Sequence, residues 1–572
     1  MASVHLTIDG KEIVAESGQT ILQAAEAAGI DIPTLCNHPA LEPIGACRMC
    51  LVEVEKQRAL QPACTFQATD GMAVHTESEK VVETRKFLLE LLFSERNHYC
   101  MYCQMSGDCE LQDLAYRYGL DAWLYPRPYT PLPVDATRQH FVMDHNRCIL
   151  CRRCIRACQE VVGNYTLAMG GRGTDSMIVA DMNVPFGESS CISCGTCLQV
   201  CPTGALMDRR SAYRGREAEV EHTVSICTVC SIGCGMSVVT RDNQILRIEG
   251  DWDSAVNAGV LCVAGRFEIL DEDRRRVTKP MIRRNGSLEA ATWDEAIGMV
   301  AGKLVATDGA LAALASSRAT NEALAQFAQL FGKLGAASVS TTVPVPDFLL
   351  EAEGSLSVLD ESDLYVVIGD DLRTDHQVAG IMIQRGVMNR GARLIIIDDE
   401  PNGMDEMTVH KFGTAELDRA IAIAQRAEIP VVVYGPGAGD LLPKLRVALG
   451  SKAQYVGLVP GSNARGALAA GLSGAFEADG HKAVYVMATD EQLDPALLDQ
   501  LATAEFVVAQ ASYADALTER ADVVLPDTIW AEKSSSTTNT EGQVQSLQAS
   551  LRAPAGVKQD TEILDLLAAK LG

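Results

Sequence analysis

The chain has 572 residues, 22% of them charged and 47% hydrophobic, with 49 Lys and Arg against 75 Asp and Glu for a formal net charge of −26. This composition is typical of a globular protein of about four domains, and no run of about eighteen apolar residues marks a transmembrane segment. The negative charge argues against nucleic acid as a partner. The first residues lack the basic and apolar regions of a signal peptide, so we expect a cytoplasmic protein.

The N-terminal sequence predicts a hairpin and two helices. Residues 3–16 alternate between apolar and polar side chains around Asp9-Gly10, which indicates a β-hairpin. Residues 20–29 predict a short helix that ends at Gly29, and residues 79–94 have the one-sided apolar period of a longer helix. The polar stretch 211–222 is a candidate linker.

The sequence beyond residue 290 has a different texture. Thr292 and Glu295 form a capping box that opens a helix. Alanine-rich helical segments then separate short β-branched runs, which predicts a parallel α/β sheet covered on both faces. The runs lie at 364–369, 394–398, 431–435, 483–487 and 522–526.

Two features of this half follow strand runs but indicate structure rather than chemistry. The glycine-rich turn at 435–439 lacks the full dinucleotide fingerprint, so we interpret it as a tight strand-to-helix connection. The carboxylates at 370–371 and 398–400 lie where α/β folds place ligands, but without a metal or a paired base we expect solvated loop side chains.

The 19 cysteines all lie at or before Cys262. In a reducing cytoplasm this density indicates metal binding rather than disulfides, and an odd count argues against complete pairing. The first group has the spacing C-x10-C-x2-C-x13-C, which favours a 2Fe-2S cluster. A zinc ribbon is the alternative, but two separate C-x2-C knuckles are missing. The group consists of Cys36, Cys47, Cys50 and Cys64. His38 lies close to it and is at most a neighbour of the ligands.

Two copies of C-x2-C-x2-C-x3-C give the strongest signal. This spacing is typical of paired 4Fe-4S clusters, in which three close cysteines bind one cube and the fourth crosses to the other. We therefore expect Cys201 to complete the first cluster and Cys158 the second. The copies are Cys148, Cys151, Cys154 and Cys158, and Cys191, Cys194, Cys197 and Cys201.

Two further groups use the remaining cysteines. Cys227, Cys230, Cys234 and Cys262 have a spacing that suits either a 4Fe-4S cluster or zinc. Cys100, Cys103 and Cys109 form an incomplete set of three thiolates. His98, two residues before Cys100, is the nearest candidate for the fourth ligand, although a lone histidine is more often an ordinary surface or core residue.

With these motifs the chain resembles the iron-sulfur subunit that NAD-linked hydrogenases and NAD-dependent formate dehydrogenases share with complex I. Residues 44–53 are similar to the 2Fe-2S domain of that family, and residues 109–112 to its 4Fe-4S domain with one histidine and three cysteine ligands. The paired cubes resemble those of formate dehydrogenases and iron-only hydrogenases. The short H-x-C spacing at His98 looks like the diaphorase iron-sulfur subunit of NAD-linked nickel-iron hydrogenases, where related families have H-x3-C.

From Cys227 onward the chain resembles the molybdopterin oxidoreductases, through residues 249–251, 261–267 and 539–545. Three departures predict a degenerate scaffold in which no molybdenum is expected. Ala264 replaces the usual lysine, no cysteine follows Cys262, and the family's C-terminal domain that closes over the second pterin is missing.

The resemblance implies an α/β and α+β multidomain fold. The expected domains are an N-terminal β-grasp 2Fe-2S ferredoxin (1–78), a 4Fe-4S domain with one His and three Cys ligands (79–135), a tandem 4Fe-4S ferredoxin domain (136–212), a 4Fe-4S domain of the molybdopterin-oxidoreductase type (220–275) and a degenerate α/β scaffold (276–572).

The expected function is electron transfer through one 2Fe-2S and four 4Fe-4S clusters, with no catalytic residues in this chain. The implied partners are an NADH/FMN-binding subunit, a small 2Fe-2S subunit, the subunits of a hydrogenase and a ferredoxin. A subunit of formate dehydrogenase or complex I is the alternative within the family. A molybdenum or tungsten enzyme and a zinc-binding adaptor are the alternatives outside it.

Overall fold

The computed structural model describes residues 3–122, 124–125, 131–307, 309–350, 354–472, 474–477 and 480–572. The chain divides into two compact units, Met1–Val220 and Glu221–Gly572, and the division falls within the predicted linker. Each unit contains buried hydrophobic clusters of its own. Among the described residues, no helix has the length and apolar character needed to cross a membrane.

The first unit begins with a five-stranded mixed sheet in the order β2-β1-β5-β3-β4. The predicted hairpin forms β1 and β2, and β1 also pairs in parallel with β5. Helix α1 (Ile21–Ala27) opens with a capping box at Thr20 and buries Ile21 and Leu22 against the sheet. The strands are β1 (Ser3–Ile8), β2 (Lys11–Glu16), β3 (Leu51–Val54), β4 (Gln61–Pro62) and β5 (Met72–His75).

The rest of the first unit consists of short elements that hold cysteine loops. Leu89 and Phe93 from α2 pack with Leu111 and Leu114 from α3 in one buried cluster that also contains Cys36 and Cys151. The elements are α2 (Glu79–Glu95), α3 (Glu110–Arg117), β6 (Val134–Asp135), β7 (Phe141–Asp144), α4 (Arg153–Arg156), β8 (Leu167–Gly170), β9 (Met177–Ala180), α5 (Thr196–Gln199) and β10 (Leu206–Asp208).

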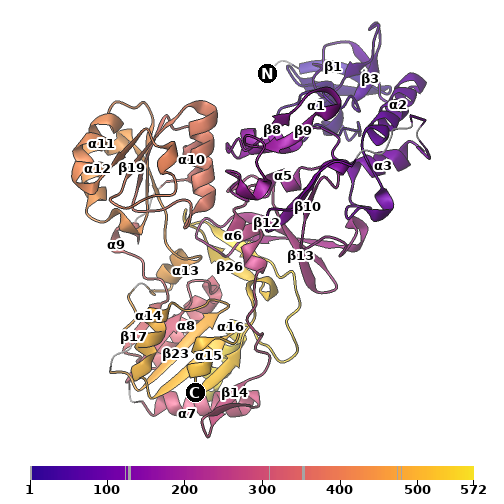
Figure 1. Ribbon diagram of the computed structural model, residues 1–572. Helices are drawn as coiled ribbons and strands as arrows, with labels where there is room; N and C mark the ends of the chain where they lie inside the picture. Colours follow the sequence, from indigo (N-terminus) through magenta and orange to yellow (C-terminus); the bar gives the residue numbers. More distant parts are fainter. Residues whose placement is uncertain are drawn as a thin grey trace. The chain divides into compact units, whose positions relative to one another are not determined.

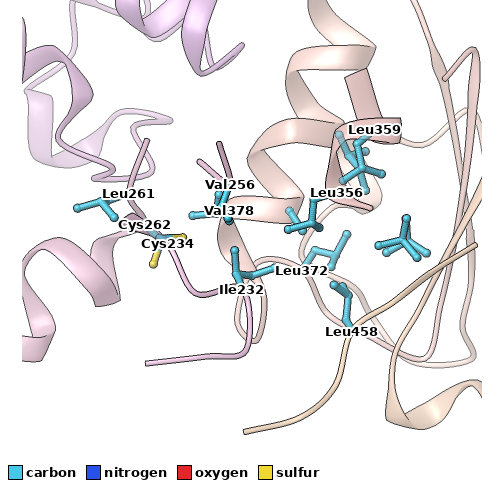
Figure 2. Close-up of a cluster of buried hydrophobic side chains, with 14 of the residues drawn as sticks. Ile232, Cys234, Val256, Leu261, Cys262, Leu356, Leu359, Leu372, Val378 and Leu458 are labelled. Carbon is cyan, nitrogen blue, oxygen red and sulfur yellow. The ribbon is translucent and has the colours of Figure 1, made fainter. Parts of the chain in front are cut away.

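The second unit opens with an antiparallel three-stranded sheet, β11-β12-β13. Its apolar side chains share a core with one face of a parallel sheet farther along the chain. Figure 2 shows Ile232, Cys234 and Cys262 in the same buried cluster as Leu372 and Val378. The elements are β11 (Glu221–Ile226), β12 (Gly235–Arg241), β13 (Gln244–Gly250) and α6 (Val263–Arg266).

A seven-stranded sheet has the order β15-β14-β25-β24-β23-β16-β17. Its strands are parallel except for the β14–β15 hairpin at one edge. Helices α7, α8 and α16 cover one face, and α14 and α15 cover the other. The elements are β14 (Met281–Arg284), β15 (Ser287–Ala290), α7 (Trp293–Val305), β16 (Leu311–Ala315), α8 (Asn321–Lys333), β17 (Ser338–Thr341), β23 (Ala483–Thr489), α14 (Pro495–Gln500), β24 (Phe506–Ala511), α15 (Ala516–Arg520), β25 (Val523–Pro526) and α16 (Asp560–Leu571).

A separate, all-parallel sheet has the order β20-β19-β18-β21-β22. Helices α11 and α12 lie on one side of it and α10 on the other (Figure 1). The elements are α9 (Asp347–Leu350), β18 (Leu364–Ile368), α10 (Gln377–Arg390), β19 (Arg393–Ile397), β20 (His410–Phe412), α11 (Leu417–Ala424), β21 (Pro430–Tyr434), α12 (Leu441–Leu449), β22 (Gln454–Gly457) and α13 (Ala464–Ala469), with a hairpin of β26 (Ser535–Thr538) and β27 (Val544–Leu547).

The expectation of one parallel sheet is wrong, because the five predicted strand runs are divided between two sheets. Hydrophobic runs identify strands, but they do not say which strand lies beside which. The glycine-rich turn at 435–439 is a tight connection, as predicted. A Cβ atom on Gly369 would come within 2.1 Å of the Ala438 nitrogen, so two strand-to-helix loops approach each other there without side chains between them.

Candidate metal centres

Four cysteines of the first unit lie on the loops around β3 and β4. The Sγ atoms of Cys50 and Cys64 are 3.4 Å apart. The amide of Cys36 donates to Cys47 Sγ over 3.3 Å, and the amide of Cys47 donates to Cys36 Sγ over 3.4 Å. Residues in the left-handed region at positions 45 and 48 (φ 60° and 63°) turn this loop. The structure therefore brings the first predicted set of four thiols together.

A buried arginine on the neighbouring helix α2 holds the loop that carries Cys50. Arg85 of α2 donates from Nε to the carbonyl of Met49 over 3.0 Å and from Nη2 to the carbonyl of Leu51 over 3.0 Å. These carbonyls flank Cys50 in the sequence, so α2 holds the ligand segment at both sides. Within the same loop, a hydrogen bond with the Cys47 thiol lowers the pKa of Cys36 to about 5, because it stabilises the thiolate.

His98 lines a cavity together with Cys100, Cys103 and Cys109. Its Nε2 atom is buried and has no hydrogen-bond partner. Burial, helped by the charges of Arg147 and Arg96, lowers the pKa of His98 to about 3, so the ring is neutral at physiological pH. A buried, unpaired imidazole nitrogen beside three thiols fits a metal ligand, because a neutral imidazole offers its lone pair to the metal.

The tandem motifs build two mixed sets. Cys201 lines one cavity with Cys148, Cys151 and Cys154, and this is the crossed arrangement that the spacing predicts. Cys158 lies in a π-helical turn, Ala157–Val161, that continues α4. Burial raises the pKa of Cys158 to about 12, with further contributions from Cys194 and Cys191, which places it near the second motif.

The two tandem loops share one backbone pattern. Leu150 and Arg152 have φ angles of 53° and 61°, and Ser193 and Gly195 have 56° and 71° at the matching positions. Left-handed residues let successive amides point into the loop, where they meet sulfur. The amide of Leu150 donates to Cys148 Sγ and that of Ser193 to Cys191 Sγ, each over 3.4 Å.

Two arginines of helix α4 connect the tandem region to the segments of two other cysteine groups in the first unit. Arg153 makes a two-pronged contact with the carboxylate of Glu110, at 2.6 and 2.8 Å, and Glu110 follows Cys109 directly. Arg156 donates to the backbone carbonyls of Cys36 and Glu42. One short helix, which itself carries Cys154, is thus bonded to the segments of the first and second centres.

The last cysteine group lies in the second unit and is buried in its core. The amide of Cys227 donates to the carbonyl of Cys234 over 2.9 Å, and the amide of Gly265 donates to Cys262 Sγ over 3.3 Å. A Cβ atom on Gly265 would come within 3.0 Å of Cys227 Sγ, so any larger residue there would crowd this sulfur. Burial raises the pKa of Cys227 to about 12.

These thiols are suited to iron-sulfur clusters. All nineteen cysteines are free of disulfides. Within the described part of the chain, no group of three or more His, Cys, Asp or Glu side chains is arranged to hold a single metal ion. Two of the groups, the one with His98 and the one that Cys201 completes, line cavities instead, which suits a cluster whose irons each take a different ligand. A bound cluster would supply one-electron transfer and would offset the high cost of ionising buried thiols.

The residues beside Ala264 do not fit a molybdopterin cofactor. A cavity of about 270 Å³ lies there, with Arg274 and Arg318 in its wall. Arg274 is already paired with Glu272 at 2.7 Å and with Asp515 at 3.2 Å. The wall contains more carboxylates than guanidinium groups, through Glu268, Asp271, Glu272 and Asp490. A phosphate-bearing anionic cofactor would meet net repulsion in this cavity.

One expectation about carboxylates is wrong. Asp370 is buried rather than solvated, and its Oδ2 lies 2.9 Å from Nδ1 of His376, which is also buried. No sequence pattern indicates this pair, because His376 reaches Asp370 only when the N-terminus of α10 turns back to the end of β18.

Asp399 and Glu400 are exposed, as predicted. His38 accepts a hydrogen bond from the Ala40 amide over 3.2 Å.

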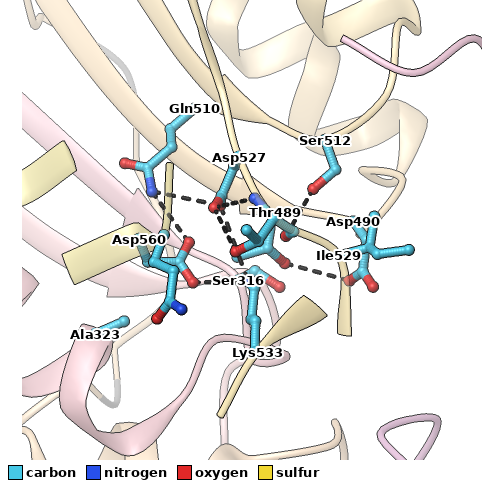
Figure 3. Close-up of polar contacts among 12 residues, drawn as sticks. Ser316, Ala323, Thr489, Asp490, Gln510, Ser512, Asp527, Ile529, Lys533 and Asp560 are labelled. Atoms are coloured by element: carbon cyan, nitrogen blue, oxygen red, sulfur yellow. Dashed lines mark hydrogen bonds and ion pairs between the residues drawn. The ribbon is translucent and has the colours of Figure 1, made fainter. Parts of the chain in front are cut away.

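A second buried polar network lies at the carboxyl ends of β24 and β25 (Figure 3). Lys533 Nζ is 2.6 Å from Asp560 Oδ2 and 4.0 Å from Asp527 Oδ2. Gln510 Nε2 donates to Asp560 Oδ1 over 3.0 Å. Sequence reasoning missed this network because its members are scattered over fifty residues. It anchors the first turn of α16, which begins at Asp560, to the sheet.

Five family models together match almost the whole chain. The matching descriptions are a 2Fe-2S iron-sulfur cluster binding domain (1–79), the NADH-ubiquinone oxidoreductase-G iron-sulfur binding region (85–122), the ferredoxin-like domain of NADH-quinone oxidoreductase subunit 3 (140–207), the molybdopterin oxidoreductase Fe4S4 domain (220–269) and molybdopterin oxidoreductase (276–431 and 448–570).

Individual proteins show the same pattern. The mitochondrial NADH-ubiquinone oxidoreductase 78 kDa subunit of Candida albicans is 28% identical over 99% of this chain and 82% of its own length. A NADH-quinone oxidoreductase subunit of Rhizobium meliloti is 34% identical over 70% of this chain, a match that spans about half (48%) of that protein. A chain in a crystal structure of an NAD+-reducing NiFe-hydrogenase in the H2-reduced state is 38% identical over 37% of this chain and 91% of its own length, with a TM-score of 0.36. With 2Fe-2S, 4Fe-4S and molybdopterin-oxidoreductase-like regions in this order, the chain belongs to the family of the large, multidomain iron-sulfur subunit of complex I.

Proposed function

We propose that this protein is an electron-transfer subunit with one 2Fe-2S and four 4Fe-4S clusters, without molybdenum and without a catalytic site of its own. The 2Fe-2S ligands are Cys36, Cys47, Cys50 and Cys64. The 4Fe-4S ligands are His98, Cys100, Cys103 and Cys109, then Cys148, Cys151, Cys154 and Cys201, then Cys158, Cys191, Cys194 and Cys197, and finally Cys227, Cys230, Cys234 and Cys262.

The observation that carries this proposal is the set of hydrogen bonds that α4 makes to other cysteine-bearing segments. Arg153 and Arg156 tie one helix of the tandem region to Glu110, beside the His98 centre, and to the carbonyl of Cys36. Electron transfer between centres needs fixed, short separations and a dry interior, and these contacts support both. The same guanidinium groups place positive charge among thiolate-bound clusters, which favours their reduced states.

We assign the chain to a soluble NAD-linked hydrogenase complex. In it, electrons pass between an NADH/FMN-binding subunit and the hydrogenase subunits, with a small 2Fe-2S subunit and a ferredoxin as further partners. The single residue between His98 and Cys100 supports this assignment, since that spacing resembles the diaphorase subunit of such hydrogenases. Because only Tyr99 separates His98 from Cys100 in the chain, His98 lines the same cavity as the three thiols.

A complex I-type NADH dehydrogenase is the second candidate. It is supported by the relatives that match over nearly the full chain, which are NADH-ubiquinone and NADH-quinone oxidoreductase subunits. Anaerobic co-purification followed by identification of the partner chains separates the two. Hydrogenase subunits favour the first candidate, and a quinone-reducing membrane module favours the second.

The Cys151→Ser variant tests the electron-relay function in the complete complex. Cys151 is buried beside Cys148 and Cys154, so losing its thiolate should break the tandem relay. We expect hydrogen-dependent NAD reduction to be lost. NADH oxidation by an artificial dye at the flavin subunit should continue, and this activity serves as the internal control. Unchanged hydrogen-dependent NAD reduction in a variant that has lost one 4Fe-4S signal would contradict the proposed route.

A further inference from the structure

A chain of three buried polar side chains ends at the Cys230 segment. Ser231 Oγ lies 3.1 Å from His376 Nε2, and His376 Nδ1 lies 2.9 Å from Asp370 Oδ2. Ser231, His376 and Asp370 are 1%, 3% and 6% exposed. The three residues come from the cysteine loop, the start of α10 and the end of β18, so the chain bonds the loop to the parallel sheet.

Ser231 is held from two directions. Its hydroxyl meets His376, and its carbonyl accepts a hydrogen bond from the Thr540 amide over 2.6 Å. His376 Nε2 also lies 3.3 Å from the carbonyl of Val459. Burial raises the pKa of the Cys230 thiol, and the backbone N–H of Ile232, the residue after Ser231, acts in the opposite direction on that pKa because it faces the sulfur. Ser231 lies between Cys230 and Ile232 in the chain, so its position fixes where that N–H lies relative to the sulfur.

Stability alone gives little reason for this arrangement. The three polar groups lie in a core otherwise formed by apolar side chains such as Leu372 and Val378. Asp370 Oδ1 is buried there without a hydrogen-bond partner. A buried carboxylate with an unpaired oxygen costs free energy, and apolar side chains of similar size would pack at lower cost. The geometry is better explained by what it does to the cysteine loop.

We propose that His376, oriented by Asp370, is a positioning residue that fixes Ser231 and so sets the reduction potential of the cluster at Cys227, Cys230, Cys234 and Cys262. Amide hydrogen bonds to a ligand sulfur stabilise the electron-richer state and raise the potential. Releasing Ser231 lets the Ile232 N–H move away from the Cys230 sulfur and lowers the potential. This inference rests on the proposed presence of a 4Fe-4S cluster at these cysteines.

The test measures the midpoint potential of this cluster by EPR redox titration of the reconstituted full chain. His376→Leu removes both ring contacts while keeping most of the volume, and Ser231→Ala removes only the hydroxyl. We expect each to shift this potential downward. The double variant should show no further shift, because both changes break one interaction. His376→Gln can still place an amide near the former Nε2 position, so its potential should remain near that of the wild type.

His222→Leu is the matched control. His222 Nδ1 also faces a serine hydroxyl, that of Ser237 at 3.3 Å, but on an exposed strand. It should leave every potential unchanged, and the clusters of the first unit serve as internal references. Unmoved potentials in His376→Leu and Ser231→Ala, or a double variant with the sum of the two shifts, would overturn the role of His376. If His376→Leu fails to bind iron, the potentials of Ser231→Ala and His376→Gln test the proposal in its place. A wild-type potential in Ser231→Ala then overturns the proposal. If the reconstituted wild-type chain gave no EPR signal for this cluster, the result would instead contradict the proposed cluster at these four cysteines.

Discussion

Exchanging His98 for cysteine tests the one histidine among the proposed cluster ligands. His98→Cys should keep a cluster at Cys100, Cys103 and Cys109 but lower its reduction potential, because a thiolate adds a negative charge where the imidazole is neutral. The pKa of His98, lowered to about 3, excludes a charged ring as the starting state at neutral pH. His98→Ala should leave three ligands and a labile cluster.

The size of the shift follows from the burial of the site. His98 is 9% exposed, so an effective dielectric constant of about 20 applies. One unit charge at about 4 Å then contributes about 4 kcal/mol, or about 170 mV for one electron. Arg147 and Arg96 act on the same ring and offset part of the added charge. We therefore expect a decrease of about 60 to 170 mV.

EPR redox titration of the full chain measures this shift, with the other clusters as internal references. His145→Gln is the matched control, because His145 is also buried and lines the neighbouring cavity, where four thiols already complete a ligand set. It should leave the His98 cluster unmoved. If every cluster signal kept its potential in His98→Cys and survived in His98→Ala, His98 would be an ordinary core residue and the ligand assignment would fall.

The remaining predictions concern cluster content, ligation and the stability of the second unit. Reconstitution should load about 18 irons per chain in a colorimetric assay, and a plateau near ten would leave at least two centres unformed. Cys201→Ser should disturb the EPR signal of the Cys148 centre and Cys158→Ser that of the other tandem cluster, and the opposite result would exclude crossed ligation. In urea denaturation, Lys533→Met should lower the free energy of unfolding by about 3 to 5 kcal/mol, because the buried Asp560 carboxylate loses its counter-charge. Asp527→Asn should cost less than about 1 kcal/mol, because burial raises the pKa of Asp527 well above its usual value and the carboxyl already carries a proton. The unfolded chain releases that proton above about pH 4, so the wild type should lose stability as pH rises from there toward the folded pKa, and Asp527→Asn should flatten this loss.

The sequence by itself determined the local structure and the candidate ligands. The hairpin, the helices α1 and α2, and the capping box of α7 all form where the sequence predicts them, because each depends on neighbouring residues. The cysteine spacings likewise define groups that the structure brings together. A loop of two or three residues between ligands leaves the backbone few alternatives, so spacing carries most of this information.

Only the tertiary structure decided how distant segments meet. It divided the predicted strands between two sheets. It also placed Asp370 and His376 against the Cys230 loop, although His376 and Ser231 are 145 residues apart in the sequence. It also gathered Lys533, Asp527 and Asp560 into one network. Local patterns record which face of an element is buried, but not which partner covers it. That partner is chosen by strand order and helix packing across the whole chain, which is why the polar contacts around the last cysteine group could not be found from the sequence.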